Sequence, residues 1–215
     1  MFTGIVEEIG VVEKVIQGNL MQLTVRAQKV MEQTKIGDSI SVNGVCLTVV
    51  LLGKDSVTFE IMKETQEKAN LKTLKNGDKI NLERAMGANS RFDGHIVSGH
   101  IDGTGKIKNK IANSGEFVLE IEADKNLIAY LVPKGSICID GISLTIVDVK
   151  ASSFSIGLIP QTLKTTTLGI KQTNDKVNLE VDLLSKYVFR YMDNNIKAGT
   201  KISENYLRNL GFGED

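Results

Sequence analysis

The chain has 215 residues with a hydrophobic fraction of 41%, which is ordinary for a globular protein of one or two domains. Its 26 basic and 26 acidic residues give a formal net charge of zero. No net field would attract a polyanion or an anionic membrane surface, so we expect neither a nucleic-acid partner nor a membrane partner.

The two cysteines and the N-terminus indicate the cellular compartment. Cys46 and Cys138 form neither a CxxC motif nor a zinc spacing, which suits a reducing cytoplasm. Glu7 and Glu8 interrupt any basic-then-apolar run, so no signal peptide is expected. No apolar run approaches the roughly 20 residues that span a bilayer. These features predict a cytoplasmic protein.

The sequence contains an internal repeat. "TGIVE" (3–7) aligns with "SGHID" (98–102) at an offset of 95. At an offset of 97, "SISVNGVCLTVV" (39–50) aligns with "SICIDGISLTIV" (136–147), and "DKINLE" (78–83) with "DKVNLE" (175–180). A duplicated domain places two similar but unequal sites in one chain.

Each copy has the pattern of short strands. Alternating β-branched runs are broken by Asn43-Gly44 in the first copy and by Asp140-Gly141 in the second, which are hairpin signals. Several strands at short spacing, with one short helix per unit, predict a small closed antiparallel barrel that is repeated. The sequence contains no GxGxxG and no Walker-type motif, which disfavours a nucleotide-binding α/β fold.

Helices are predicted at four places. One covers residues 63–74, and its counterpart over 160–170 opens with proline, a residue tolerated at a helix start. Residues 183–196 have apolar side chains at spacings of three and four, and Ser203 caps a further segment. The helix at 183–196 either folds back onto its own barrel or mediates oligomerisation.

The repeated strand predicts a ligand-binding face. Alternation over residues 42–50 places an aliphatic set on the barrel core: Val45, Leu47 and Val49. The opposite face collects Val42, Gly44, Cys46, Thr48 and Val50. The second copy repeats this pattern with Gly141, Ser143 and Thr145. A small-residue depression with a few polar groups suits a flat heteroaromatic ligand. The alternative, ordinary strand residues around a buried cysteine, explains the double occurrence less well.

The two histidines argue against a metal. His95 and His100 are five apart, so on a strand they would point to opposite faces. His100 stands where the first copy has Ile5, and Asp182 stands where it has Ala85. Both are polar groups that only one half possesses.

Six segments together resemble the alpha-type riboflavin synthase family over essentially the whole chain. They are "MFTGIVE" (1–7), "NGVCLTV" (43–49), "MKET" (62–65), "HIVSGHIDG" (95–103), "IDGISLT" (139–145) and "IPQTL…TTLG" (159–169). The resemblance implies a mainly β protein of two six-stranded antiparallel barrels, residues 1–95 and 96–186, followed by a helical segment, 187–215, that assembles a homotrimer. It also implies a transferase without cofactor or metal. The expected reaction is a dismutation of two 6,7-dimethyl-8-ribityllumazines into riboflavin and 5-amino-6-(ribitylamino)uracil.

The same resemblance names the site residues. The expected catalytic participants are Cys46, His100, Thr145 and Asp182, supported by Ser39 and Phe2. The first pocket is expected to be lined by Gly4, Ile5, Val6, Cys46, Leu47, Thr48, Glu60, Ile61, Met62, Lys63, Glu64 and Thr65. The second is expected to be lined by Gly99, His100, Ile101, Lys134, Ser143, Leu144, Thr145, Gly157, Leu158, Ile159, Pro160, Gln161 and Thr162. In the family, the first barrel of one subunit faces the second barrel of its neighbour.

A non-catalytic carrier is the main alternative. Lumazine proteins resemble this sequence and hold the chromophore without transforming it, but their second-half pocket is eroded. Here the second half keeps Gly99-His100, 143–145 and Thr162, which favours the enzyme.

Overall fold

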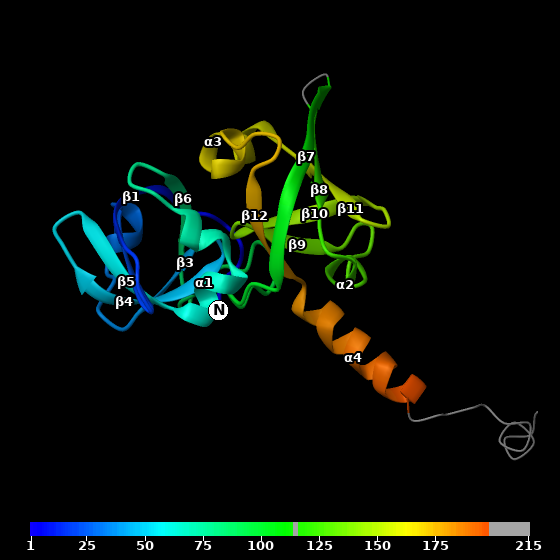
Figure 1. The fold of residues 1–215 in the computed structure, drawn as a ribbon, viewed down its shortest axis with the longest axis horizontal. Helices are drawn as coiled ribbons and strands as arrows, with labels where there is room; N and C mark the ends of the chain where they lie inside the picture. Colours follow the sequence, from blue (N-terminus) through cyan, green and yellow to red (C-terminus); the bar gives the residue numbers. More distant parts are fainter. Residues whose placement is uncertain (114–115, 198–215) are drawn as a thin grey trace, which may run out of the picture.

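The computed structural model describes residues 1–113 and 116–197. Within these residues the chain forms two closed antiparallel barrels of six strands each, which lie side by side and are followed by a helix (Figure 1). The fold class expected from the sequence is confirmed.

The sequence repeat is also a topological repeat. The first barrel consists of β1 (Glu8–Ile16), β2 (Leu20–Arg26), β3 (Ser39–Val42), β4 (Val45–Leu52), β5 (Ser56–Met62) and β6 (Lys79–Arg84). The second consists of β7 (Gly103–Asn113), β8 (Glu116–Glu122), β9 (Ser136–Ile139), β10 (Ile142–Val149), β11 (Ser153–Leu158) and β12 (Lys176–Val181). The first barrel closes in the order β1-β2-β5-β4-β3-β6 and the second in the order β10-β11-β8-β7-β12-β9. Traced around the ring, these two orders are the same.

Each barrel has its own apolar core. Val45, Leu47 and Val49 all lie in the first core, as the alternation predicts. Val42 was expected on the opposite face, and this prediction is wrong, because Val42 is fully buried in the same core. The two-residue turn at 43–44 pairs Val42 directly with Val45, and directly paired residues of a hairpin share a face.

The helix expected over 63–74 is divided into two pieces. α1 (Lys63–Lys68) and η2 (Asn70–Thr73) are separated by Ala69, whose backbone is extended at φ −110° and ψ 163°. The counterpart divides in the same way into α3 (Pro160–Thr165) and η3 (Thr167–Gly169). The break has a structural use, since the first residue after it donates a backbone hydrogen bond to the other barrel. The described residues also contain two other short helices, η1 (Lys29–Met31) and α2 (Lys125–Ile128).

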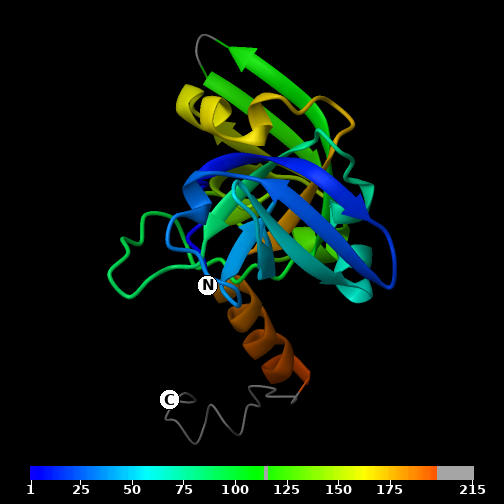
Figure 2. The same cartoon turned by 90° about the vertical axis from the view of Figure 1, so that its left-hand side faces the viewer.

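The C-terminal helix α4 (Leu183–Lys197) extends away from both barrels (Figures 1 and 2). Lys186 Nζ lies 2.7 Å from Asp102 Oδ1, and the ring of Phe189 lies 4.6 Å from that of Tyr130. Much of its apolar surface is exposed, including 66% of Leu184 and 69% of Tyr187. The helix therefore does not fold back over its barrel in the described residues. The segment that Ser203 was expected to cap lies outside them.

Among the helices of residues 1–113 and 116–197, none combines the length and apolar character needed to cross a membrane.

Candidate functional site

The N-terminal segment crosses from the first barrel to the second. The backbone N–H and the hydroxyl of Thr3 donate to Glu83 Oε1 at 2.7 and 2.8 Å, and the Gly4 N–H donates to Glu83 Oε2 at 3.1 Å. The carbonyl of Gly4 then accepts a hydrogen bond from the N–H of Ser143 on β10, at 2.8 Å. Residues 3–4 are thus held by β6 of their own repeat and contact the other repeat.

The second repeat does the same in the opposite direction. The backbone N–H and the hydroxyl of Ser98 donate to Glu180 Oε1 at 2.7 and 2.6 Å, and the Gly99 N–H donates to Oε2 at 3.0 Å. The Gly99 carbonyl accepts from the N–H of Cys46 on β4, at 2.9 Å. The two crossings are equivalent under an approximate two-fold axis.

Both crossings require glycine. Gly4 and Gly99 have φ of +78° and +84°, a left-handed conformation that L-residues with a side chain rarely adopt. A Cβ on Gly4 would lie 2.6 Å from Ser143 Cβ, and one on Gly99 would lie 2.5 Å from Cys46 Cβ. The backbone of each segment therefore lies directly against the pocket strand of the other repeat.

This exchange corrects the expected composition of the two pockets. Gly4, Ile5 and Val6 were grouped with Cys46, and residues 99–101 with Ser143; the structure pairs them the other way round. Val6 packs against the second core, and Ile101 packs against the first. The sequence repeat shows which residues are equivalent, but equivalence does not show which barrel they contact.

The Cys46 pocket is a cavity of about 320 Å³ between the first barrel and the crossing segment. It is lined by Val45, Cys46, Glu64, Thr65, Lys68, Ala69, Gly99, His100 and Ile101. The cavity brings together two expected catalytic residues, the half-buried Cys46 and the exposed His100. Thr48 lies exposed on the same strand.

At the Ser143 junction, the crossing segment meets a histidine that the sequence analysis did not select. His95 Nδ1 lies 2.7 Å from Ser143 Oγ, and only 7% of the residue is exposed. Burial lowers the pKa of His95, and the charge of Asp182 acts in the opposite direction. Its Nε2 is buried without a hydrogen-bond partner in the described residues.

The remaining expected catalytic residues lie near these junctions in different settings. Asp182 is half-buried and its Oδ1 accepts the N–H of Leu184 at 2.9 Å, which caps α4. Thr145 is exposed on β10. Ser39 lines a larger cavity of about 610 Å³ that Ile5 also lines. The cavity of the Cys46 pocket therefore collects only some of the expected residues.

Phe2 lies between the barrels. It is 0% exposed and belongs to a small apolar cluster with Val97 and Cys138, against which Cys46 packs. Phe2 and Val97 also exchange backbone hydrogen bonds of 2.8 and 3.1 Å. These two residues are mates in the repeat, so they meet on the approximate two-fold axis.

The other expected binding residues lie at the ends of matched strands. Residues 60–65 span the end of β5 and the start of α1, and 157–162 span the end of β11 and the start of α3. Lys134 has φ +66° where the first copy has Gly37, at φ +95°. A lysine in this conformation is strained, and such strain is concentrated at functional sites.

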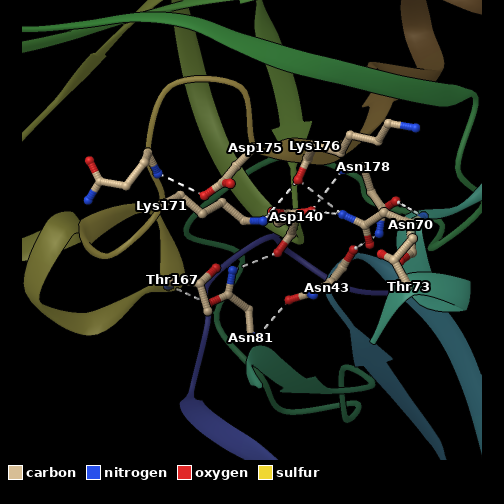
Figure 3. Close-up of polar contacts among 11 residues, drawn as sticks. Asn43, Asn70, Thr73, Asn81, Asp140, Thr167, Lys171, Asp175, Lys176 and Asn178 are labelled. Atoms are coloured by element: carbon tan, nitrogen blue, oxygen red, sulfur yellow. Dashed lines mark hydrogen bonds and ion pairs between the residues drawn. The ribbon is translucent and has the colours of Figure 1, made fainter. Parts of the chain in front are cut away.

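Two asparagines link the barrels through a buried polar network (Figure 3). Asn81 Nδ2 donates to the carbonyl of Asp140 at 2.8 Å, and Asn178 Nδ2 donates to that of Asn43 at 2.8 Å. The backbone N–H of Asn70 donates to Asn178 Oδ1 at 2.7 Å (Figure 3). Because these three bonds cross the interface, they fix one barrel relative to the other.

The glycines of the two hairpin turns meet in this interface. A Cβ on Gly44 would lie 2.8 Å from the nitrogen of Gly141, and the converse also holds. The sequence analysis placed Gly44 on the pocket face beside Cys46, and this is wrong. The turn moves the glycine out of the strand and against the other barrel.

One buried ion pair breaks the symmetry of the network. Lys171 Nζ lies 3.3 Å from Oδ2 of Asp140, which is 0% exposed (Figure 3). Burial raises the pKa of Asp140, with the charge of Lys171 opposing the effect. In the first copy the equivalent positions are Asn43 and Leu74, so no equivalent pair exists there.

Comparison with known proteins agrees with this architecture. The sequence matches the lumazine-binding domain family twice, over residues 3–85 and 98–182. The riboflavin synthase of Actinobacillus pleuropneumoniae is 43% identical over 215 residues, covering 99% of this chain and 100% of that protein. That of Bacillus subtilis is 42% identical over 215 residues, with coverage of 99% and 100%. That of Mycobacterium bovis is 45% identical over 197 residues, with coverage of 89% and 98%.

Solved structures show the same fold with ligands bound. LumP complexed with 6,7-dimethyl-8-(1'-D-ribityl) lumazine has a TM-score of 0.77 at 26% identity, and covers 84% of this chain and 99% of its own. LumP complexed with riboflavin has a TM-score of 0.78 at 28% identity, with the same coverage. The resemblance drawn from the sequence is confirmed. The chain belongs to the lumazine-binding domain family, carries that domain twice, and matches over nearly its full length relatives that are named riboflavin synthase.

Proposed function

We propose that the chain catalyses the formation of riboflavin from two molecules of 6,7-dimethyl-8-ribityllumazine. One molecule gives up a four-carbon unit and becomes 5-amino-6-(ribitylamino)uracil, and the other accepts the unit and becomes riboflavin. The atoms of two lumazines balance those of the two products, so no oxidant, reductant or further co-reactant is consumed. The observation that carries the proposal is the paired crossing at Gly4 and Gly99, which builds two equivalent junctions with unlike polar side chains.

Unlike pockets suit this reaction because two identical substrates must take opposite roles. Cys46 and His100 belong to one pocket, whereas Ser143 and His95 belong to the other junction. The backbone frame is shared, and the polar groups differ. Orienting two bulky reactants against each other can contribute about 7–11 kcal/mol toward the barrier.

The residues then have the following proposed roles. The reaction begins with the loss of a proton from the activated methyl group of one lumazine. His100 is exposed and lines the cavity, so it can exchange a proton with a bound ligand and with water. Such general acid–base help contributes about 10²–10⁴-fold. Cys46 lines the same cavity, Thr145 and Ser39 contribute polar groups, and Asp182 supports the Ser143 junction.

Assembly, class and location complete the proposal. We assign the enzyme to the transferases, as a homotrimer in which the first barrel of one subunit faces the second barrel of a neighbour. The exposed apolar side chains of α4, including Leu184 and Tyr187, support helix-mediated assembly. The free thiols of Cys46 and Cys138 support a cytoplasmic location.

A single experiment separates the enzyme from its main alternative. The similarity to LumP structures with lumazine and riboflavin bound favours a non-catalytic carrier as the second candidate. Purified protein is mixed with 6,7-dimethyl-8-ribityllumazine, and riboflavin absorbance and ligand fluorescence are followed. An enzyme converts the lumazine at many equivalents per chain. Bound lumazine that stays unchanged would identify a carrier, and neither signal would reject both candidates.

A further inference from the structure

The repeated motifs "DKINLE" and "DKVNLE" end in glutamates that the proposed chemistry does not use. Glu83 lies on β6 and Glu180 on β12, and they are 5% and 2% exposed. We propose that Glu83 and Glu180 are positioning residues, each of which holds a segment of its own repeat against the pocket strand of the other repeat. The effect on turnover rests on the proposed function; the effect on structure does not.

Each carboxylate accepts three hydrogen bonds, which the side-chain amide of glutamine could not accept together. Glu180 Oε1 takes the N–H and hydroxyl of Ser98, and Oε2 takes the N–H of Gly99, all within 3.0 Å. An ionised carboxylate only accepts hydrogen bonds. A glutamine would present an NH₂ group to at least one of these donors. A buried N–H left without an acceptor destabilises the arrangement.

In each segment the hydroxyl that donates to the glutamate also accepts a hydrogen bond from the backbone two residues further on. Ser98 Oγ accepts the N–H of His100 at 3.2 Å, and Thr3 Oγ1 accepts that of Ile5 at 3.3 Å. The direction of the backbone into the pocket is therefore set by a carboxylate in the body of one barrel. Glu180 of the second barrel controls how Gly99 and His100 close over Cys46 of the first.

The two cysteines allow this to be measured without a ligand. The Gly99 backbone lies against Cys46, where an added Cβ would be 2.5 Å from Cys46 Cβ. Release of the segment should therefore expose the thiol. Cys138 is 1% exposed, and burial raises the pKa of its thiol well above the usual value. Alkylation of the native protein by iodoacetamide therefore reports on Cys46.

The test compares Glu180→Gln with Glu83→Gln in the full chain. We expect Cys46 to be alkylated about tenfold faster in Glu180→Gln, the factor that corresponds to losing one charge-assisted hydrogen bond. In Glu83→Gln, which releases the segment at Ser143, the rise should be clearly smaller, because that segment reaches Cys46 only through the Phe2 cluster. Peptide mapping of the alkylated protein confirms that Cys46 is the labelled residue.

Two milder variants control for the possibility that the glutamine substitutions unfold the protein. Ser98→Ala and Thr3→Ala each remove one of the three hydrogen bonds and should show the same contrast with smaller factors. Thermal unfolding of each variant shows that the barrels remain folded. An unchanged Cys46 rate in both folded Glu180→Gln and Ser98→Ala would overturn the proposal. An equal rise in the Glu180 and Glu83 variants would also overturn it, because a general loss of stability would then explain both.

Turnover provides a separate arm. Both glutamine variants should lose riboflavin formation, with weaker lumazine binding at the pocket that each glutamate serves. If the wild type forms no riboflavin and the Cys46 contrast is still observed, the proposed function fails and the positioning role stands. If the wild type turns over and the contrast is absent, the positioning role fails alone.

Discussion

The Cys46 pocket of the first barrel and the Ser143 junction of the second are equivalent in backbone and different in chemistry. Both consist of a hairpin strand, a crossing glycine and a clamping glutamate, with matching hydrogen bonds. Cys46 has His100 beside it in an open cavity, whereas Ser143 has the buried His95. The backbone arrangement around each of these two places is therefore common to both repeats. The residues that differ between the halves are therefore the ones to examine for the two substrate roles.

The largest effect should follow removal of residues 1–4. This change deletes Gly4 from the Ser143 junction and Phe2 from the cluster between the barrels, so turnover should be abolished. The Cys46 pocket keeps Gly99 and His100, so it should still bind lumazine. Fluorescence titration should show the stoichiometry falling from two ligands per chain to one. Normal turnover in the truncated protein would show that the junction at Ser143 is not a site.

Replacing His100 in the Cys46 pocket by isoleucine, the residue at the equivalent position 5 of the first repeat, should be the next most damaging change. His100→Ile removes the imidazole that lines the cavity, and we expect a loss of about 10²–10⁴-fold in single-turnover rate. Lumazine binding should be largely retained, because the backbone contacts remain. Ile5→His, the reverse exchange in the other half, serves as the control and should not restore the rate in the double variant. A loss of less than about threefold would remove His100 from the proton-transfer role.

The asymmetric ion pair predicts a loss of stability without a direct effect on chemistry. Lys171→Leu leaves the buried Asp140 carboxylate without its charge partner, and breaking a buried pair from one side costs about 3–5 kcal/mol. Adding Asp140→Asn recreates the residues of the first copy and should recover most of this loss. Chemical denaturation of the single and double variants measures both values. Equal stabilities of wild type and Lys171→Leu would mean that the ion pair does not stabilise the folded state.

The smallest effect should be a pH dependence that comes from the Ser143 junction. Burial places the pKa of His95 below its ordinary value of 6.5, so the folded state binds this proton less readily than the unfolded state. Stability should therefore fall as the pH drops through 6.5 toward the folded-state pKa. His95→Gln should flatten this part of the stability–pH curve in denaturation experiments. Identical curves for wild type and His95→Gln would contradict the assigned burial effect.

Much of the architecture could be predicted from the sequence because it depends on local patterns. The aliphatic alternation at Val45, Leu47 and Val49 correctly identified the core, and the repeat correctly indicated two equivalent barrels. Val42 and Gly44 were misplaced because a two-residue turn resets the alternation of faces. The helix over 63–74 was predicted whole, since nothing local shows that Asn70 must donate its N–H to the other barrel.

The site was harder to predict because it depends on contacts between the repeats. Gly4 and Gly99 were identified as equivalent, but equivalence does not determine which barrel each segment contacts. The glutamates of the repeated "NLE" triplets were visible as identities, and that signal could have selected them. His95 had no such signal, because its mate at the offset of 95 would precede Met1.

The central claim is that the two pockets share one frame but have different roles, and exchanging Cys46 and Ser143 tests it most directly. Only a cysteine offers a thiol that can ionise appreciably near neutral pH. Single-turnover riboflavin formation is measured beside lumazine binding for Cys46→Ser, Ser143→Cys and the double variant. We predict that Cys46→Ser slows turnover with binding largely preserved, and that adding Ser143→Cys does not restore it. A double variant as fast as the wild type would show that the pockets are interchangeable and would contradict the account.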